Sequence, residues 1–317
     1  MARRVLITGA SGFVGQWLAR ALLERGDTVI GGTLTGTPQP GVLPPSAVRS
    51  IDWVELDVTQ NDRVRDSVVK CRPDWVAHLA GIAFPPEANA SPALALQVNV
   101  IGTANVLTAT HAANAEARVL IVGSADQYGP HPREAYPIRE DASQLPRSFY
   151  GSSKAAQEIV ALQVWRANGL GVVCTRSFNH SGVGHAGSYL LPALVDRARA
   201  LRSVGGSALL IGNPEPVRDY LHVCDVVEAY VRLLDRGVAG EVYNVCSGTG
   251  TSVRQLAEHV LRRLNIDAEI APDPELMRPS DTPVLVGDNG KLRAATGWTP
   301  ERSIDDIIDD LIHAAAR

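Results

Sequence analysis

The chain has 317 residues, of which 45% are hydrophobic and 20% charged, and its formal net charge is −4. This balance is typical of a globular protein with a large core. A weakly acidic chain without a basic block argues against nucleic acid or anionic membranes as partners. The apolar stretch behind Met1–Arg4 is too short for a signal peptide, and no apolar run approaches the roughly 20 residues of a membrane helix. We therefore expect a cytoplasmic protein.

Three glycines follow the first apolar run, Val5–Ile7, in the sequence Thr-Gly-Ala-Ser-Gly-Phe-Val-Gly at residues 8–15. The helical pattern Phe13–Arg25 begins within this loop. In such a strand–turn–helix the first glycine allows a tight turn, the second lets backbone amides approach a pyrophosphate, and the third lets the helix pack on the strand. The helix N-terminus also favours phosphate. The loop predicts a dinucleotide site, with contacts from Gly9, Ser11, Gly12, Phe13, Val14 and Gly15.

Short apolar strands alternate with helical patterns through the first half of the chain. Strands are expected at Val5–Thr8, Thr28–Gly31, Asp52–Leu56, Trp75–Leu79, Arg118–Val122 and Val172–Arg176, and helices at Phe13–Arg25, Asn61–Lys70, Pro92–Ala113 and Tyr150–Ala167. Near-continuous apolar strands between helices indicate a parallel sheet covered on both faces. The predicted fold is α/β, a doubly wound Rossmann-type sheet with ligands at the carboxyl ends of its strands. The Gly31–Ser46 segment is expected to be a long loop.

The regular alternation of strands and helices ends after Ser177. Helical patterns at Tyr189–Arg202, Asp225–Leu234, Val253–Leu264 and Ile304–Ala315 are joined by loops rich in Gly and Pro, with short strands at Ala208–Ile211 and Glu241–Val245. We expect residues 1–177 to form the dinucleotide-binding domain, with a returning segment near 217–238, and residues 178–317 to form a smaller α+β lobe for the substrate.

Cysteines and histidines show no metal-ligand spacing, so no metal site is expected. The cysteines are scattered, which favours reduced thiols over disulfides: Cys71, Cys174, Cys224 and Cys246. Four of the eight histidines are interpreted as loop or packing residues: His78, His180, His185 and His222.

Tyr150 and Lys154 stand four positions apart at the start of a predicted helix, which places them on one face. An ammonium near a phenol favours the phenolate and lowers the tyrosine pKa, and a tyrosine tuned in this way can exchange a proton with a carbonyl or carbinol oxygen. Ser124 follows the strand Arg118–Val122 and is placed to hydrogen-bond the same oxygen. Each of these residues taken alone is also compatible with a surface or turn position.

Together these features resemble the extended short-chain dehydrogenase/reductase superfamily over essentially the whole chain. The resemblance implies that Ser124 and Tyr150 bind the reacting oxygen and that Lys154 holds the nicotinamide ribose. It also implies cofactor contacts from the motifs Leu-Asp-Val, His-Leu-Ala-Gly and Val-Asn-Val-Ile-Gly-Thr, through Asp57, Val58, Leu79, Ala80, Gly81 and Asn99. For Asn99, capping or packing within its helix is an equal alternative.

The second half of the chain is similar to the enzymes of GDP-6-deoxyhexose synthesis in three stretches: Arg176–His180, Ile211–Tyr220 and Met277–Pro283. This resemblance implies that Asn179, Arg218 and Arg278 bind the sugar nucleotide. Two arginines from separate loops can clamp a diphosphate with forked donors. A surface ion pair is the alternative for either arginine considered alone.

The run Ser124-Ala-Asp-Gln-Tyr bears on the choice of reaction. The dehydratases among the enzymes that this chain resembles carry threonine at the position of Ser124. Two residues later they carry a glutamate, which removes a proton from the carbon beside the transient ketone. Asp126 is one methylene shorter, and elimination needs its base within hydrogen-bond reach. We therefore expect reduction of a nucleotide-linked 4-keto-6-deoxy sugar, with GDP-4-keto-6-deoxy-D-mannose giving GDP-D-rhamnose. A 4,6-dehydratase acting on GDP-mannose, a 4-epimerase and a non-enzymatic nucleotide sensor remain alternatives.

The end of the second strand reads Gly31-Gly-Thr33, without the acid that grips the ribose 2′-hydroxyl of NAD or a nearby arginine. Because no carboxylate repels a 2′-phosphate and Thr33 can donate to it, NADPH is favoured over NADH as cofactor. The resemblance further implies a homodimer built on the helices Pro92–Ala113 and Tyr150–Ala167, whose apolar and alanine positions exceed what one core face needs.

Overall fold

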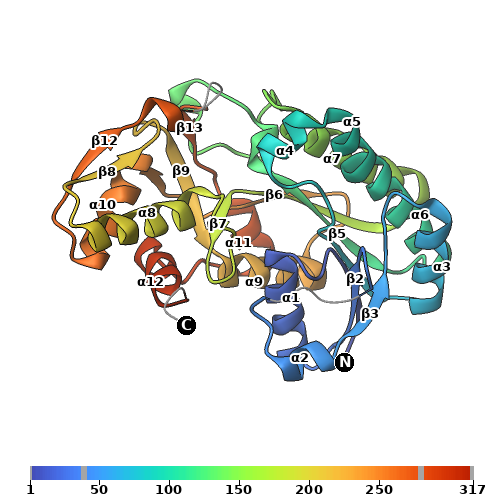
Figure 1. Ribbon diagram of the computed structural model, residues 1–317. Helices are drawn as coiled ribbons and strands as arrows, with labels where there is room; N and C mark the ends of the chain where they lie inside the picture. The colour runs from blue at the N-terminus through green and yellow to red at the C-terminus, as the bar shows by residue number, and fades with distance from the viewer. Residues whose placement is uncertain (1, 37–40, 278–281, 315–317) are drawn as a thin grey trace.

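A parallel sheet forms the centre of the computed structural model, which describes residues 2–36, 41–277 and 282–314 (Figure 1). Within these ranges the sheet has seven strands in the order β10-β6-β5-β4-β1-β2-β3, all paired in parallel. Their bounds are β1 Arg4–Thr8, β2 Thr28–Thr33, β3 Asp52–Glu55, β4 Trp75–His78, β5 Arg118–Ser124, β6 Gly171–Ser177 and β10 Val242–Val245. The order reverses between β1 and β4, which confirms the predicted doubly wound fold and places its ligand crevice there.

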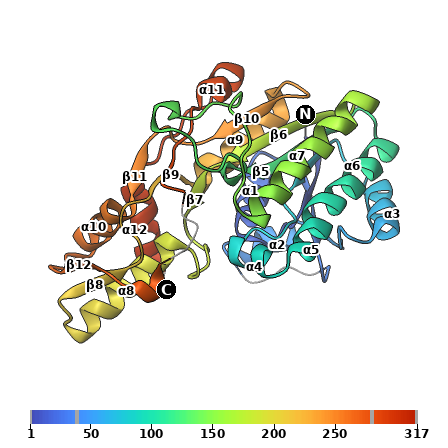
Figure 2. The ribbon, with the colours of Figure 1, turned by 90° about the horizontal axis from the view of Figure 1, so that it is seen from above.

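Helices cover both faces of this sheet (Figure 2). One face carries α1 (Phe13–Glu24), α9 (Val223–Arg236) and α11 (Gly290–Thr296) over a buried apolar layer. The other face carries α3 (Asn61–Cys71), α6 (Gly102–Ala113) and α7 (Phe149–Asn168). Because both faces of each central strand are buried, the strands read as continuous apolar runs, and this explains why the sequence located them.

The helix expected at Pro92–Ala113 has three parts: α5 (Pro92–Leu96), the π-helical turn η1 (Gln97–Ile101) and α6. By length and composition this stretch is apolar enough to cross a membrane, contrary to the expectation from the sequence, and 44% of its most apolar window is buried inside the protein. It packs against α3 and α7 and buries polar side chains, among them Asn99 and Thr103. These contacts are those of a core helix.

A second lobe holds the shorter strands and lies to one side of the sheet in Figure 1. Strand β9 (Val217–His222) pairs with β7 (Asn179–Ser181), β11 (Gly250–Ser252) and β13 (Val284–Leu285). A separate pair joins β8 (Ala208–Ile211) to β12 (Glu269–Pro272). Three helices pack over them around one apolar cluster: α8 (Leu190–Val204), α10 (Val253–Leu264) and α12 (Ile304–Ala314).

The chain passes repeatedly between the sheet and the second lobe. It leaves the sheet after β6, returns through α9 and β10, leaves again for β11, returns as α11 and ends in α12. The strand expected at Glu241–Val245 is thus an edge strand of the first sheet, whereas β9, inside the expected returning segment, belongs to the second lobe. A domain boundary at residue 177 stays a prediction.

The expected loop Gly31–Ser46 is shorter than predicted at both ends. Strand β2 continues to Thr33, and the short helix α2 (Pro45–Arg49) begins before the segment ends. Two small elements flank the crevice, α4 (Pro85–Ala90) after β4 and the 3₁₀ turn η2 (Ala125–Gln127) after β5. Two further 3₁₀ turns lie farther away, η3 (Arg133–Ala135) and η4 (Pro274–Leu276).

Candidate active site

The glycine loop between β1 and α1 is packed too tightly for side chains. Gly9 has a φ of +70°, and a Cβ there would lie 2.9 Å from the Ala80 amide nitrogen. A Cβ at Gly15 would lie 2.4 Å from the Gly9 carbonyl oxygen. Gly12 caps α1 with no side-chain cap, so the first amides of a 12-residue helix face the loop. These backbone groups form a cradle suited to a pyrophosphate.

The loop after β4 is braced against this cradle. Thr8 Oγ1 accepts a hydrogen bond from the Ala80 amide at 3.1 Å and contacts His78 Nδ1 at 2.8 Å. His78 Nε2 meets Thr103 Oγ1 at 3.0 Å, and burial lowers the pKa of His78 to about 3, so the ring is neutral. The structure therefore assigns His78 a bracing role, and the loop with Leu79, Ala80 and Gly81 lies beside Gly9.

Asn99 holds the same loop from the π-helical turn. Its Oδ1 accepts from the Ile82 amide at 2.8 Å, and its Nδ2 donates to the Ile82 carbonyl and to Ser153 Oγ. The amide is fully buried. Asn99 thus ties the loop after β4 to α7, which is a packing role. A direct contact of Asn99 with the cofactor stays a prediction.

Ser124 and Tyr150 meet at the carboxyl end of β5. Ser124 ends the strand and caps η2, accepting from the Asp126 amide at 3.2 Å. Tyr150 lies in the first turn of α7, which Ser148 caps, and its phenol shares a side-chain hydrogen bond with Ser124. A Cβ at Gly151 would lie 2.6 Å from the Asp126 carbonyl oxygen, so this glycine lets α7 approach the turn.

The environment of Tyr150 differs from the expectation. Burial, followed by the nearby Asp126 carboxylate, raises the pKa of Tyr150, and the bond with Ser124 opposes this. The expected lowering of the pKa by Lys154 is not present, because the ammonium is directed elsewhere. Tyr150 therefore keeps its proton well above neutral pH, which suits a proton donor.

Lys154 is 5% exposed and donates to two oxygens, the Val122 carbonyl and Gln157 Oε1, each at 2.9 Å. Burial lowers the pKa of Lys154 to about 8. A Cβ at Gly81 would lie 3.6 Å from Nζ, so the ammonium borders the loop after β4. Lys154 thus faces the region where the resemblance places the nicotinamide ribose.

A buried network behind Ser124 was not found from the sequence. The Ser124 amide donates to Gln127 Oε1, and Gln127 Nε2 donates to Glu158 Oε2, both at 2.9 Å. Glu158 also pairs with Arg176, with an Nη2–Oε1 distance of 2.7 Å and both side chains 6% exposed. The network ties β5, α7 and β6 together. Only its Ser124–Gln127 part, a capping box, has a spacing that the sequence alone could show.

Asp57 and Thr33 lie on the far side of the cradle, at the ends of β3 and β2. Asp57 Oδ1 accepts from the amide and hydroxyl of Thr59, and Val58 beside it is buried. Thr33 is buried at the end of β2, and its carbonyl accepts from the Leu56 amide. The structure therefore brings these three expected cofactor contacts together at the carboxyl ends of β2 and β3.

Two of the three expected substrate residues lie in the second lobe. Asn179 begins β7 beside Tyr220 of β9, and Arg218 is half-buried on β9. Arg218 Nη1 donates to the Val217 and Thr282 carbonyls, at 2.9 and 2.7 Å. Arg278 lies outside the described residues, so its place in the site stays a prediction.

Aromatic rings connect the cradle with the second lobe. His185 stacks on Phe13 with centroids 4.6 Å apart and lies 4.2 Å from the ring of Tyr189. Tyr189 meets Phe84 edge-on at 5.2 Å and is close enough to Tyr150 to act on its pKa. Burial lowers the pKa of His185 to about 3, so this ring is neutral. No local pattern predicts these contacts, because the rings come from three separate segments.

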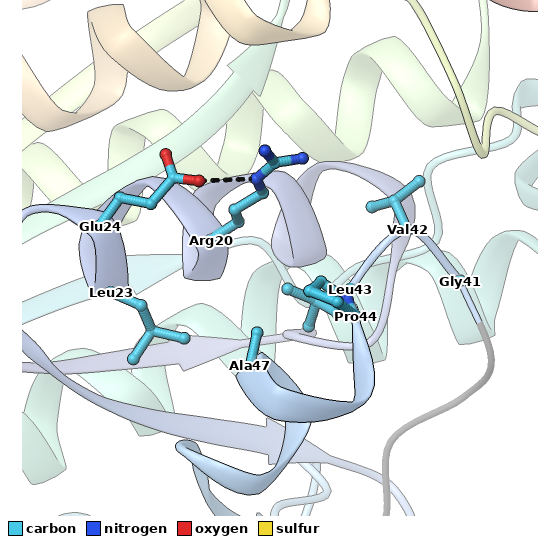
Figure 3. A pocket seen from close by; sticks show the side chains of 8 residues that line it. All are labelled: Arg20, Leu23, Glu24, Gly41, Val42, Leu43, Pro44 and Ala47. Carbon is cyan, nitrogen blue, oxygen red and sulfur yellow. Dashed lines mark hydrogen bonds and ion pairs between the residues drawn. The ribbon is translucent and has the colours of Figure 1, made fainter.

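A hollow of about 570 Å³ lies between α1 and the segment before α2, lined by Arg20, Leu23, Glu24, Gly41, Val42, Leu43, Pro44 and Ala47 (Figure 3). Arg20 and Glu24 pair across its rim at 2.8 Å, and it contains none of the catalytic candidates. Among the residues that the structure describes, no cluster of His, Cys, Asp and Glu could hold a metal.

The family model described as GDP-mannose 4,6 dehydratase matches residues 6–311. The chain belongs to this family. It is also similar to GDP-6-deoxy-D-mannose reductase of Pseudomonas aeruginosa, with 36% identity over 305 residues, 96% of this chain and 94% of the relative. These matches confirm membership of the extended short-chain dehydrogenase/reductase superfamily, and the chain is an enzyme of this oxidoreductase type.

Two solved structures bear on the cofactor. One, described as RMD from Pseudomonas aeruginosa complexed with NADPH, has a TM-score of 0.84 and 34% identity, with all of both chains covered. The other, UDP-glucose 4-epimerase of Thermus thermophilus with NAD, has a TM-score of 0.85 and 26% identity over 98% of each chain. Together with the glycine cradle, which side chains would fill, they support a nicotinamide dinucleotide at this site.

Proposed function

We propose that this protein reduces a nucleotide-linked 4-keto-6-deoxy sugar with a nicotinamide cofactor, converting GDP-4-keto-6-deoxy-D-mannose to GDP-D-rhamnose. The observation that carries the proposal is the Ser124–Tyr150 pair, in which a buried phenol keeps its proton and is bonded to a second hydroxyl. Such a pair can hold a ketone oxygen and protonate it. The similarity to GDP-6-deoxy-D-mannose reductase along nearly the whole chain supports this choice of substrate.

In this mechanism the ketone oxygen lies between the hydroxyls of Ser124 and Tyr150. The Asp126 amide orients the Ser124 hydroxyl, and Gln127 holds the backbone of Ser124. The glycine loop would hold the pyrophosphate of a nicotinamide dinucleotide and Lys154 its nicotinamide ribose, and this cofactor would supply the hydride for the carbonyl carbon. Tyr150 transfers its proton to the oxygen as negative charge develops there.

Asp126 favours reduction over dehydration. Its carboxylate acts on Tyr150, so it lies near the reacting groups, but it is one methylene shorter than the glutamate of the resembling dehydratases. Ser124 likewise replaces their threonine. The dehydratase is the second candidate because of the family match. A 4-epimerase is a further candidate, supported by the similarity to UDP-glucose 4-epimerase.

The deciding experiment supplies one of two substrates to the purified protein. With GDP-4-keto-6-deoxymannose and NADPH, we expect oxidation of the cofactor and a GDP-6-deoxyhexose product. With GDP-mannose alone, we expect little or no 4-keto-6-deoxy product. Asp126→Asn should reduce the reductase rate less than Tyr150→Phe does. Efficient conversion of GDP-mannose without NADPH, lost in Asp126→Asn, would establish the dehydratase instead.

We also propose NADPH as the preferred cofactor, since Gly31-Gly-Thr33 presents no carboxylate at the end of β2. Thr33→Asp should shift the preference toward NADH, because the new carboxylate would accept from the ribose hydroxyls and repel a 2′-phosphate. The measurement is the ratio of kcat/KM for NADPH and NADH in both proteins. A wild-type protein that strongly prefers NADH would contradict the proposal.

A further inference from the structure

Gln157 is a fully buried glutamine that is bonded at one end. Its Oε1 accepts from Lys154 Nζ at 2.9 Å, one helical turn earlier on α7. Its Nε2 is buried without a hydrogen-bond partner, one of three such side-chain atoms among the described residues. Lysine has donors and no acceptor, so the orientation of the amide follows from this bond.

An unsatisfied buried amide is unfavourable and calls for an explanation. An apolar side chain of the same length, such as methionine, would fill the space without leaving a donor unpaired. The glutamine is therefore best explained by what its oxygen does for Lys154. Gln127 provides a contrast, because this buried glutamine is bonded at both ends, to the Ser124 amide and to Glu158.

Two protons of the Lys154 ammonium are accounted for by Gln157 and the Val122 carbonyl. An ammonium has three, and Nζ borders the loop at Gly81. The two acceptors come from α7 and β5, so together they fix the position of the nitrogen and leave one N–H for a ligand on the loop side. Bonds to the charged form also oppose the burial that disfavours it.

We propose that Gln157 is a positioning residue, which holds the Lys154 ammonium charged and oriented for the cofactor. The inference rests on the proposed role of Lys154 as the ribose-binding group. The side-chain oxygen of Gln157 is needed as an acceptor for the buried Lys154, and the side-chain nitrogen is left without a hydrogen-bond partner as a result.

The charges around Lys154 leave few other groups to control its protonation. From β4, His78 faces it as a neutral ring, since burial lowers the pKa of His78 to about 3. On α7 itself, Tyr150 is neutral because its pKa is raised. From the turn after β5, Asp126 acts on Tyr150. The loss of the ammonium on raising the pH therefore depends on burial, which lowers the pKa of Lys154 to about 8, and on its two acceptors.

The test compares Gln157→Met and Gln157→Glu with the wild-type protein. Binding of the dinucleotide is measured between pH 6.5 and pH 9.5, and the thermal midpoint at pH 7. In Gln157→Met, the pH at which affinity declines should fall by about one unit, because the charged form has lost an acceptor. In Gln157→Glu it should rise. The alkaline limb of kcat/KM should move in the same directions.

Thermal stability distinguishes positioning from mere packing. Gln157→Met removes the unpaired Nε2 together with one acceptor of Lys154, so the thermal midpoint should change little, whereas Gln127→Met should lower it, because it removes the acceptor of the Ser124 amide and one donor to Glu158. In a Lys154→Met background, Gln157→Met should no longer change the pH dependence of binding.

Three results would overturn the proposal: an unchanged pH dependence in Gln157→Met, shifts in one direction for both variants, or a shift that persists without Lys154. Because dinucleotide binding is read directly, these outcomes stand even if the protein proves inactive on the 4-keto sugar, which would contradict the proposed function alone.

Discussion

Tyr150 is the side chain whose loss should separate chemistry from binding. Tyr150→Phe keeps the ring that packs among Ala88 and Ala95 and removes the hydroxyl bonded to Ser124. General acids contribute about 10²–10⁴-fold, so kcat should fall within this range while the dinucleotide affinity is retained. Steady-state kinetics and a binding titration measure the two effects. A loss of less than tenfold would exclude Tyr150 as the proton donor.

Arg218 should act on substrate affinity. A charge-assisted hydrogen bond contributes about 1.5–3 kcal/mol, so Arg218→Ala should raise the KM for the sugar nucleotide roughly ten- to a hundredfold. The KM for the dinucleotide should change little. Because Arg218 also holds the Thr282 carbonyl, the thermal midpoint must be compared to exclude general destabilisation. A rise confined to the dinucleotide KM would show that Arg218 lies on the cofactor side.

At the residue scale, the sequence predicts those candidate site residues that form a recognisable pattern within one short segment. Tyr150 and Lys154 share one helix, and the glycines share one loop, so their pattern was visible. Gln157 lies only three residues after Lys154, yet its bond to Nζ depends on both side chains being buried. The network behind Ser124 joins separate segments, since Gln127 of η2 bonds Glu158 of α7, which pairs with Arg176 of β6. Their roles depend on which strands become neighbours, which a single sequence does not encode locally.

The buried ion pair between Glu158 of α7 and Arg176 of β6 should stabilise the fold more than the exposed pair Glu228–Arg232 of α9 does. Glu158→Ala would leave Arg176 charged and unpaired in the interior, and breaking such a pair costs about 3–5 kcal/mol. Glu228→Ala, which removes a more exposed pair with Arg232 on α9, should cost about 0.3–0.5 kcal/mol. Urea unfolding of both variants measures the difference. Equal losses would mean that the Glu158 pair contributes no more than a surface bridge.

The elements found from the sequence are those with an uninterrupted apolar signal. The central strands are buried on both faces and were located to within a few residues. Strands β7, β11 and β13 have three residues or fewer, which is too short for any periodicity. The π-helical turn at Gln97–Ile101 is too short to change the helical period, so the sequence predicts a continuous helix there.

At the scale of the whole molecule, we propose a homodimer. Large apolar side chains are exposed on neighbouring helices: Leu94 and Leu96 on α5, Ile101 on η1 and Ile159 on α7, with Ile159 64% exposed. A second copy of this surface would cover them, as stable interfaces need about 800 Å² per partner. Light scattering at micromolar concentration should give twice the chain mass, and Ile159→Glu should shift it toward the monomer. A wild-type monomer would contradict the proposal.

The repeated passage of the chain between the sheet and the second lobe has a consequence for how such a protein can be altered. Over the described residues the second lobe consists of three separate stretches, each joined to the central sheet or to a helix that covers it. No single cut of the chain frees either lobe as a continuous piece. A whole new substrate lobe therefore cannot be acquired by exchanging one continuous segment of the gene.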